Sequence, residues 1–281
     1  MADYLSEAKK RVTTLELVAM KRQGRKIVMI TAYDALFGAL VDAAGVDVVL
    51  VGDSVAPVLA GEETTLPATV EQMIYHGRIT RRGVRRALVV VDLPFLSYQV
   101  SIPDAIANAG RILKETGAGA VKLEGGAAWA PTIAALVNAG IPVIGHLGFT
   151  PQSVHQLGGF KIQGKEADGA ARLAEDAKAL EQAGAFAMVL ELMPGPVAAA
   201  ITRAVSIPTV GIGAGPDCDG QVLVLHDMLG LNEGFTPKFL KRYAELGQAV
   251  RDAVSRFGDE VRGGQYPGLE HTHGAVETRE Q

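Results

Sequence analysis

Short apolar runs rich in Val, Ile and Leu alternate along the chain with longer segments whose apolar positions repeat at helical spacing. The short runs are apolar at successive positions, which is typical of parallel strands that are buried on both faces. We expect strands at Ile27–Thr31, Val48–Val51, Ala87–Val91, Ala120–Leu123, Val143–His146, Ala187–Glu191, Thr209–Ile212 and Gln221–Leu225. Between and after them the pattern predicts helices at Ala35–Ala44, Val70–Arg82, Pro103–Thr116, Ala128–Ala139, Lys165–Ala183, Val197–Val205 and Lys238–Phe257.

Glycine-containing turns join several predicted helices to the strands that follow, as in Ala-Gly-Val at 44–46 and Ala-Gly-Ala at 183–185. Glycine adopts the left-handed conformation that ends a helix, so these turns support the alternation. Repeated short crossovers indicate a parallel sheet, and eight strands favour a closed (βα)8 TIM barrel over an open doubly wound sheet. The last strand has an alternative, because residues 221–231 also fit a helix.

The two ends of the chain differ from its middle. Thr13–Gly24 predicts a short amphipathic helix that closes the N-terminal mouth of the barrel. The first and last segments are polar, so we interpret 1–281 as a single barrel domain in which 1–12 and 272–281 are disordered.

Composition narrows the class of protein. The single Cys218 excludes an intramolecular disulfide and fits a reducing compartment. The sequence contains neither a secretory leader pattern nor an apolar run of membrane-spanning length, which predicts a cytoplasmic protein without membrane contact. A net charge of −4 and the lack of a long basic block argue against a nucleic-acid partner.

Charged side chains recur where predicted strands end. They are Asp53, Asp92, Lys122 with Glu124, His146 and Glu191. Parallel strands bring their carboxyl ends together, and in (βα)8 barrels the chemistry lies at that face. The sequence therefore predicts one site built from several strands.

Asp53 and Asp92 follow neighbouring strands, and two carboxylates plus waters are a usual way to hold Mg²⁺ with positions open for substrate. Glu124 is a third candidate, as a direct ligand or through water. The alternative is that these acids cap helices or bind loop amides. Lys122 and Glu124 point the same way because they are two residues apart on one strand. We expect Lys122 to pair with Glu124 or with a substrate carboxylate; a Schiff-base lysine is the rival use.

Glu191 ends a wholly apolar run, and a carboxylate among such neighbours suits a general base. His146 is a candidate substrate contact, with an ordinary structural histidine as the alternative. The segments 148–153 and 157–164 form a long loop of the kind that serves as a lid or binding loop. Gly211–Gly215 does not have dinucleotide-binding spacing, because Pro216 stands where the third glycine is needed.

Ordered motifs along the chain resemble the ketopantoate hydroxymethyltransferase family. They are Thr-Ala-Tyr-Asp at 31–34, Val-Gly-Asp-Ser at 51–54, Asp-Leu-Pro-Phe-Leu-Ser-Tyr-Gln at 92–99, Val-Lys-Leu-Glu-Gly-Gly at 121–126, Gly-His-Leu-Gly at 145–148, Thr-Pro-Gln-Ser at 150–153, Gly-Ile-Gly-Ala-Gly at 211–215 and Asp-Gly-Gln-Val-Leu-Val-Leu-His-Asp at 219–227. The resemblance spans about Thr13 to His271. It implies a (βα)8 barrel of the phosphoenolpyruvate/pyruvate superfamily that assembles as a homodecamer.

The resemblance also implies the reaction and the roles of residues. A hydroxymethyl group passes from 5,10-methylenetetrahydrofolate to 3-methyl-2-oxobutanoate, giving 2-dehydropantoate in pantothenate synthesis. By resemblance Asp53 and Asp92 bind Mg²⁺ with Glu124 beside it, Ser54 and Lys122 hold the 2-oxo acid, and Glu191 is the base that forms the enolate.

Two other functions remain open from the sequence. A Mg²⁺-dependent C–C lyase of the isocitrate lyase kind usually carries a cysteine in a Lys-Lys-Cys-Gly-His loop, whereas Cys218 lies in Pro-Asp-Cys-Asp-Gly. A non-catalytic metabolite-binding barrel would not need the acids, Lys122 and Glu191 together. The chain departs from the family pattern at two places. Glu62 and Glu63 stand where an aromatic residue is expected; these acids either alter the folate-binding side of the site or only solvate the loop. Leu192 replaces an expected cysteine.

Overall fold

The computed structural model describes residues 11–234 and 236–274. These residues form two compact units, one of 11–225 with 237–240 and the other of 226–234 with 236 and 241–274. Most of the predicted terminal disorder falls on 1–10 and 275–281, which lie outside the described residues. The single-domain organisation stays a prediction.

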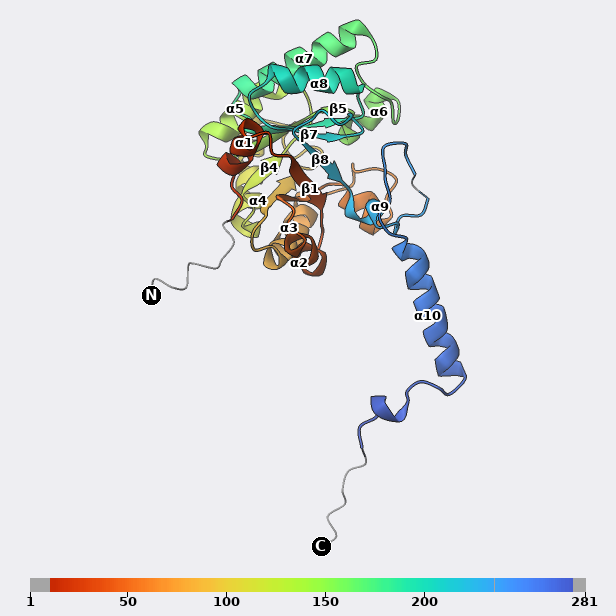
Figure 1. The fold of residues 1–281 in the computed structure, drawn as a ribbon. Coiled ribbons are helices and arrows are strands. Elements are labelled where there is room, and N and C mark those ends of the chain that lie inside the picture. The colour runs from red at the N-terminus through yellow and green to blue at the C-terminus, as the bar shows by residue number, and fades with distance from the viewer. Residues whose placement is uncertain (1–10, 235, 275–281) are drawn as a thin grey trace. The chain divides into compact units, whose positions relative to one another are not determined.

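The first unit contains a closed barrel of eight parallel strands in sequential order, with β8 pairing β1 (Figure 1). This confirms the predicted (βα)8 fold. The strands are β1 (Ile27–Thr31), β2 (Val48–Val51), β3 (Leu88–Asp92), β4 (Ala120–Lys122), β5 (Val143–Gly148), β6 (Ala187–Glu191), β7 (Thr209–Ile212) and β8 (Gly220–Leu223). The α-helices are α1 (Thr14–Arg22), α2 (Ala35–Ala43), α3 (Val70–Gly83), α4 (Ile102–Thr116), α5 (Ala130–Asn138), α6 (Val154–Leu157), α7 (Ala167–Gln182), α8 (Gly195–Ala204), α9 (Leu225–Met228) and α10 (Leu246–Arg262). Shorter helical turns are η2 (Ala56–Ala60), η3 (Ala127–Trp129), η4 (Pro151–Ser153) and η5 (Leu269–His271).

The last helix is the one predicted element that was placed wrongly. The sequence predicts Lys238–Phe257, whereas α10 begins at Leu246 and continues to Arg262. The amides of Tyr243 and Leu246 bond instead to the carbonyls of Met228 and Leu229, so this stretch forms a turn-rich segment. The other predicted helices and the strands agree within two residues at each end. The helical alternative for 221–231 holds only from Leu225 to Met228.

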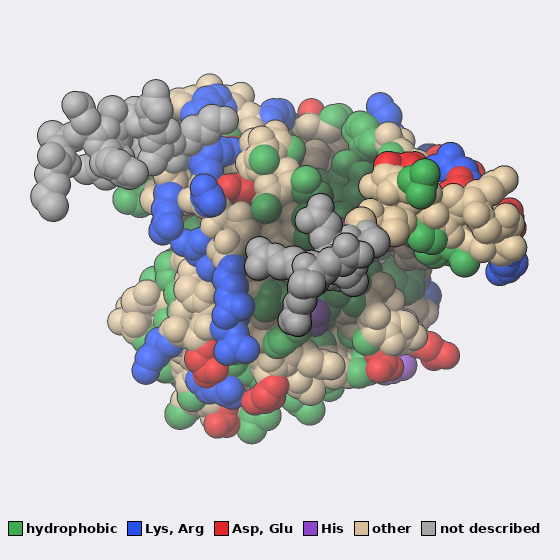
Figure 2. All heavy atoms as spheres, turned by 90° about the horizontal axis from the view of Figure 1, so that it is seen from below, with side chains coloured by type: hydrophobic (Ala, Val, Ile, Leu, Met, Phe, Trp, Pro, Cys, Tyr) green, Lys and Arg blue, Asp and Glu red, His purple; other side chains and the backbone are tan. Residues whose placement is uncertain are grey.

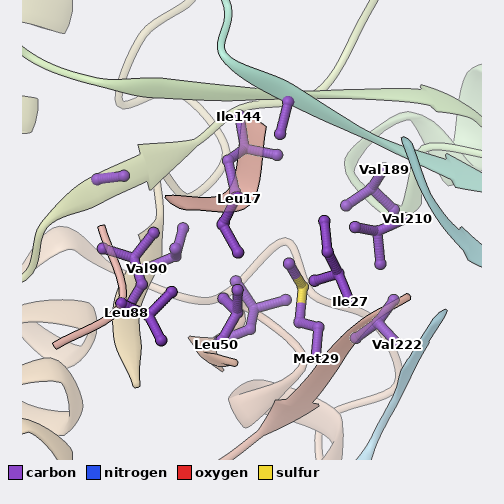
Figure 3. Packing of buried hydrophobic residues seen from close by; sticks show 14 of the residues in the cluster. Leu17, Ile27, Met29, Leu50, Leu88, Val90, Ile144, Val189, Val210 and Val222 are labelled. Carbon is purple, nitrogen blue, oxygen red and sulfur yellow. The ribbon is translucent and has the colours of Figure 1, made fainter. Parts of the chain in front are cut away.

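The barrel interior is filled by apolar side chains from the strands. Leu17 and Met20 of α1 pack into the same cluster as Ile27 and Met29 of β1, as Figure 3 shows for Leu17, Ile27 and Met29. Leu17 is 1% exposed. The predicted closing role of the N-terminal helix is therefore confirmed, and burial of these side chains leaves the opposite, carboxyl-terminal end of the barrel for polar groups.

The crossover helices begin with local signals in the sequence. Thr69 and Gln72 form a reciprocal capping box at the start of α3. Ser101 caps α4 by accepting from the amide of Asp104, and Gly117, with φ of 73°, ends that helix. Such caps satisfy amides and carbonyls that the helix leaves free. They fix where each strand-to-helix loop begins and ends.

The surface carries mixed charge. Figure 2 shows a face on which Lys and Arg side chains gather in a run, with acidic side chains scattered beside them. The formal net charge is nevertheless −4, so the basic run is local and the absence of a nucleic-acid partner stays a prediction. Within the described residues no helix is long and apolar enough to cross a membrane.

Candidate active site

The charged strand ends converge at the carboxyl end of the barrel. Asp92 of β3 lies opposite Lys122 of β4 in the strand register. Glu191 ends β6 beside Gly148 of β5 and Ile212 of β7. Asp53 follows β2, and its amide donates to Asp92 Oδ2 at 3.1 Å. The parallel arrangement thus brings together residues that are far apart in the sequence.

Lys122 lies at the centre of this group. Its Nζ is 3.2 Å from Asp92 Oδ1 and 3.9 Å from Glu124 Oε1. It is also 3.3 Å from His146 Nδ1. Burial alone would lower the pKa of Lys122, but the carboxylates around it raise it above its ordinary value. The raised pKa favours the ammonium form of Lys122, whose nearest carboxylate is Asp92 and not the expected Glu124, and this environment disfavours the Schiff-base use.

His146 connects two acids. Its Nδ1 lies 3.4 Å from Glu124 Oε1 and its Nε2 lies 3.1 Å from Glu191 Oε2. Burial and the Lys122 charge act to lower the pKa of His146, but the bonds to Glu124 and Glu191 raise it to about 9. The ring is 2% exposed. The raised pKa favours the protonated ring, and His146 lies between the two carboxylates.

Glu191 has a partner that its apolar strand does not indicate. Its carboxylate is 16% exposed and faces His146, so it is accessible from the mouth of the barrel as well as ion-paired. The next residue, Leu192, has a positive φ of 46°, which is unusual for a side chain with a Cβ. Its backbone bonds to Ile212 and Gln163 hold this conformation. Such strain clusters at functional sites, where the surrounding structure maintains it.

Ser54 lies at the edge of the group. Its hydroxyl is 2.8 Å from the hydroxyl of Tyr33, a fully buried side chain. This contact fixes the direction of the serine oxygen. Tyr33 carried no functional prediction, although it belongs to the Thr-Ala-Tyr-Asp motif.

The site holds more acids than bases. Burial raises the pKa of Asp53 well above its usual range, and the nearby carboxylates of Glu124 and Asp92 add to this effect. Burial likewise raises the pKa of Asp92, although Lys122 opposes it. Burial would raise the pKa of Glu124 too, but His146 and Lys122 lower it. Uncompensated carboxylates of this kind are stabilised by a further cation.

The donors suit a hard divalent cation. Asp92 Oδ1 and Glu124 Oε1 are buried and make no hydrogen bond of regular geometry among the described residues, although Lys122 Nζ lies 3.2 Å from the first and His146 Nδ1 lies 3.4 Å from the second. Residues 11–234 and 236–274 hold no group of three or more His, Cys, Asp or Glu arranged as a complete metal site. Mg²⁺ is usually bound by one or two carboxylates together with water and substrate, so Asp53 and Asp92 with Glu124 nearby fit that mode.

Gln152 and Tyr98 also belong to the site, although neither was among the predicted site residues. Gln152 Nε2 donates to Asp53 Oδ2 at 2.9 Å, and its backbone amide donates to Glu124 Oε2 at 2.9 Å. The Tyr98 hydroxyl lies 3.0 Å from Gln152 Oε1. Both residues fall in motifs of the family resemblance, which is the only signal that marked them.

Solved structures share the architecture. Phosphonopyruvate hydrolase in complex with oxalate and Mg²⁺ matches with a TM-score of 0.61 at 14% identity, covering 94% of this chain and 92% of that one. The 2,3-dimethylmalate lyase, a member of the PEP mutase/isocitrate lyase superfamily, matches with a TM-score of 0.59 at 17% identity, covering 94% and 93%. At such identities the likeness shows the fold alone, which is the expected TIM barrel.

Sequence comparison goes further. The 3-methyl-2-oxobutanoate hydroxymethyltransferase of Moorella thermoacetica (strain ATCC 39073 / JCM 9320) is 56% identical over 262 residues, 93% of this chain and 97% of the relative. That of Syntrophotalea carbinolica (strain DSM 2380 / NBRC 103641 / GraBd1) is 54% identical over 263 residues, covering 94% and 98%. The sequence model described as ketopantoate hydroxymethyltransferase matches residues 11–269. Since both kinds of match span nearly the whole barrel, the chain belongs to the ketopantoate hydroxymethyltransferase family of enzymes.

Proposed function

We propose that the enzyme transfers a hydroxymethyl group from 5,10-methylenetetrahydrofolate to 3-methyl-2-oxobutanoate, giving 2-dehydropantoate for pantothenate and coenzyme A synthesis. The observation that carries the proposal is the meeting of Asp53, Asp92, Lys122 and Glu191 at the carboxyl end of the barrel in a member of this family.

Each side chain has a proposed task. Lys122 offers a fixed positive charge to the carboxylate of the 2-oxo acid, and the Ser54 hydroxyl, oriented by Tyr33, adds a hydrogen bond. Glu191 takes the proton from C3, and the electron pair of that C–H bond forms the enolate. The enolate carbon then bonds to the one-carbon unit, both carbon–nitrogen bonds of that unit to the folate break to leave tetrahydrofolate, and one water molecule supplies the oxygen of the new hydroxymethyl group. His146 holds Glu191 from the other side at 3.1 Å and contacts the substrate.

We further propose that Asp53 and Asp92 bind Mg²⁺, with Glu124 beside it. The bound cation would act as a Lewis acid on the keto oxygen and make the C3 proton more acidic. The surplus of acids over bases supports this assignment, as do the buried oxygens Asp92 Oδ1 and Glu124 Oε1, which face Lys122 and His146 but make no hydrogen bond of regular geometry. A solved barrel of the same fold, phosphonopyruvate hydrolase, is described in complex with oxalate and Mg²⁺.

Carbon NMR tests the reaction. Labelled 3-methyl-2-oxobutanoate is mixed with methylenetetrahydrofolate, the purified enzyme and Mg²⁺, with and without EDTA. We expect a new hydroxymethyl signal that is lost with the chelator. A signal that persists with EDTA would contradict the metal assignment. If folded protein gives no signal under either condition, the transferase reaction is wrong and C–C lyase substrates should be tried next.

We also propose that the enzyme works as a homo-oligomer, a decamer by family resemblance, in the cytoplasm. The support for assembly is the apolar stripe of α10, which consists of Leu246, Val250, Val254, Phe257 and Val261, all exposed. The support for location is the free, buried Cys218, which fits a reducing compartment.

A further inference from the structure

One glutamine residue bridges two carboxylates of the candidate metal site, one through its side chain and the other through its backbone amide. Gln152 lies in η4, at the beginning of the long segment between β5 and α7, and is 5% exposed. Its side chain crosses to Asp53, which is 99 residues away in the sequence. A buried polar side chain placed this way is costly unless every polar atom is satisfied.

The Gln152 amide is fully satisfied. Nε2 donates one hydrogen to Asp53 Oδ2 and the other to the carbonyl of Leu93, both at 2.9 Å. Oε1 accepts from Gln99 Nε2 at 3.2 Å and lies 3.0 Å from the Tyr98 hydroxyl, whose single hydrogen is shared with the carbonyl of Glu124 at 2.9 Å. A primary amide has two donor hydrogens and two acceptor positions, so none is left over. Rotating the amide by half a turn would set Oε1 against the oxygens of Asp53 and Leu93, so the network allows one orientation.

The same residue also restrains a second acid. The backbone amide of Gln152 donates to Glu124 Oε2 at 2.9 Å, while Glu124 Oε1 lies 3.4 Å from His146 Nδ1 and 3.9 Å from Lys122 Nζ. For Asp53, Oδ2 is engaged by Gln152, and no hydrogen bond within residues 11–234 and 236–274 involves Oδ1. Gln152 therefore holds one oxygen of each acid, and the second oxygen of Asp53 is left for a different partner.

We propose that Gln152 is a positioning residue for the divalent cation: it orients Asp53 through its side chain and Glu124 through its backbone. This inference rests on the metal assignment made above. Partners that hold a coordinating carboxylate typically change metal affinity by about 10- to 100-fold when removed. The segment between β5 and α7 thus contributes to the site through Gln152 without supplying a ligand.

The test is Gln152→Met, which keeps the length of the side chain and the backbone amide but removes the donors to Asp53 and Leu93. Mn²⁺ binding to the purified full chain is measured from the EPR signal of the free ion. We expect the dissociation constant to rise about 10- to 100-fold. The matched control is Gln163→Met in the same segment, because Gln163 Nε2 donates, within the part of the chain that the structure describes, only to the carbonyl of Lys161. The Mn²⁺ affinity of this control should equal that of the wild type.

A purely structural role gives a different result. In that case Gln152→Met lowers the melting temperature without metal, but its Mn²⁺ dissociation constant stays within about twofold of the wild type, and the proposal is overturned. If Gln152→Met does not fold, Gln99→Met decides, because it removes the Gln99 Nε2 donor to Gln152 Oε1 and leaves the bonds between Tyr98 and the Glu124 backbone in place. We expect that variant to weaken Mn²⁺ about two- to fivefold, and an unchanged affinity would overturn the proposal. Absence of Mn²⁺ binding to the wild type would instead refute the metal assignment, and this inference with it.

Discussion

Glu191 is the residue whose proposed role is most directly testable. Glutamine has nearly the same shape as glutamate but cannot accept the C3 proton. We expect Glu191→Gln to slow deuterium exchange at C3 of 3-methyl-2-oxobutanoate in D₂O by about 10²- to 10⁴-fold, while calorimetry shows that the oxo acid still binds. Glu166→Gln is the control, because Glu166 is exposed and its side chain makes no capping bond. Normal exchange in Glu191→Gln would show that another group is the base.

Lys122 and the proposed cation both offset the negative charge of the buried carboxylates, so the loss of one should increase the stabilising effect of the other. Removing one partner of a buried ion pair costs about 3–5 kcal/mol, because the remaining charge stays buried. We expect Lys122→Met to melt at a lower temperature in EDTA, since Asp92 loses its ammonium partner at 3.2 Å. Mn²⁺ should then raise the melting temperature by more than in the wild type, because the ion restores positive charge beside the carboxylates.

The measurement is thermal unfolding with and without Mn²⁺. Lys178→Met, at an exposed position of α7, is the control and should behave as the wild type. An equal Mn²⁺ effect in Lys122→Met and in the wild type would argue against a cation bound next to Asp92.

At the scale of elements, Asp42 joins the end of α2 to the beginning of β3. It accepts hydrogen bonds from the amides of Arg85, Arg86 and Ala87, the shortest at 2.7 Å. Burial acts to raise the pKa of Asp42, but these amides and the Arg86 charge lower it overall. The carboxylate form is thus favoured in the folded state, so the contribution to stability is present above the unfolded pKa, about 3.9.

We therefore expect Asp42→Ala to lower the free energy of unfolding at pH 7 by about 2–3 kcal/mol, measured with urea. The difference from the wild type should stay constant down to about pH 5 and shrink as the pH falls through the lowered folded-state pKa. Glu175→Ala, at an exposed position of α7, serves as the control. A difference between Asp42→Ala and the wild type that grows on acidification would contradict the assigned sign.

The elements were predictable where the pattern is local. Uniformly apolar strands and glycine-terminated helices predicted the barrel, because strand burial and helix ends depend on residues that are close together in the sequence. Parallel strands then implied that Asp53, Asp92 and Lys122 meet. The contacts of Gln152 were not predictable, because single hydrogen bonds between segments that are distant in the sequence produce no repeating pattern of residue types. The beginning of α10 was missed for a similar reason, since amides before it bond to a segment that lies earlier in the chain.

At the scale of the whole molecule, the two units differ in how far they bury their apolar side chains. The barrel buries its cluster within itself, whereas α10 has no buried residue along its 17 positions. The stripe residues follow spacings of three and four, so they share one face of the helix. Exposed apolar surface of this kind marks an interaction site more often than chance. We propose that the stripe is exposed because it packs against other copies of the chain in a homo-oligomer. Changes in the stripe should then change the mass of the protein in solution.

The double variant Val254→Glu with Phe257→Glu places two charges in the stripe. Burying them in an interface would cost far more than leaving them in water, so we expect the complex to dissociate. Size-exclusion chromatography with light scattering should show the wild type at a multiple of 29.5 kDa and the variant nearer to 29.5 kDa. The control Gln248→Glu with Ser255→Glu adds the same charges away from the stripe and should keep the wild-type mass. Equal masses for both double variants would exclude the stripe as an assembly surface, and a monomeric wild type would refute the proposed oligomer.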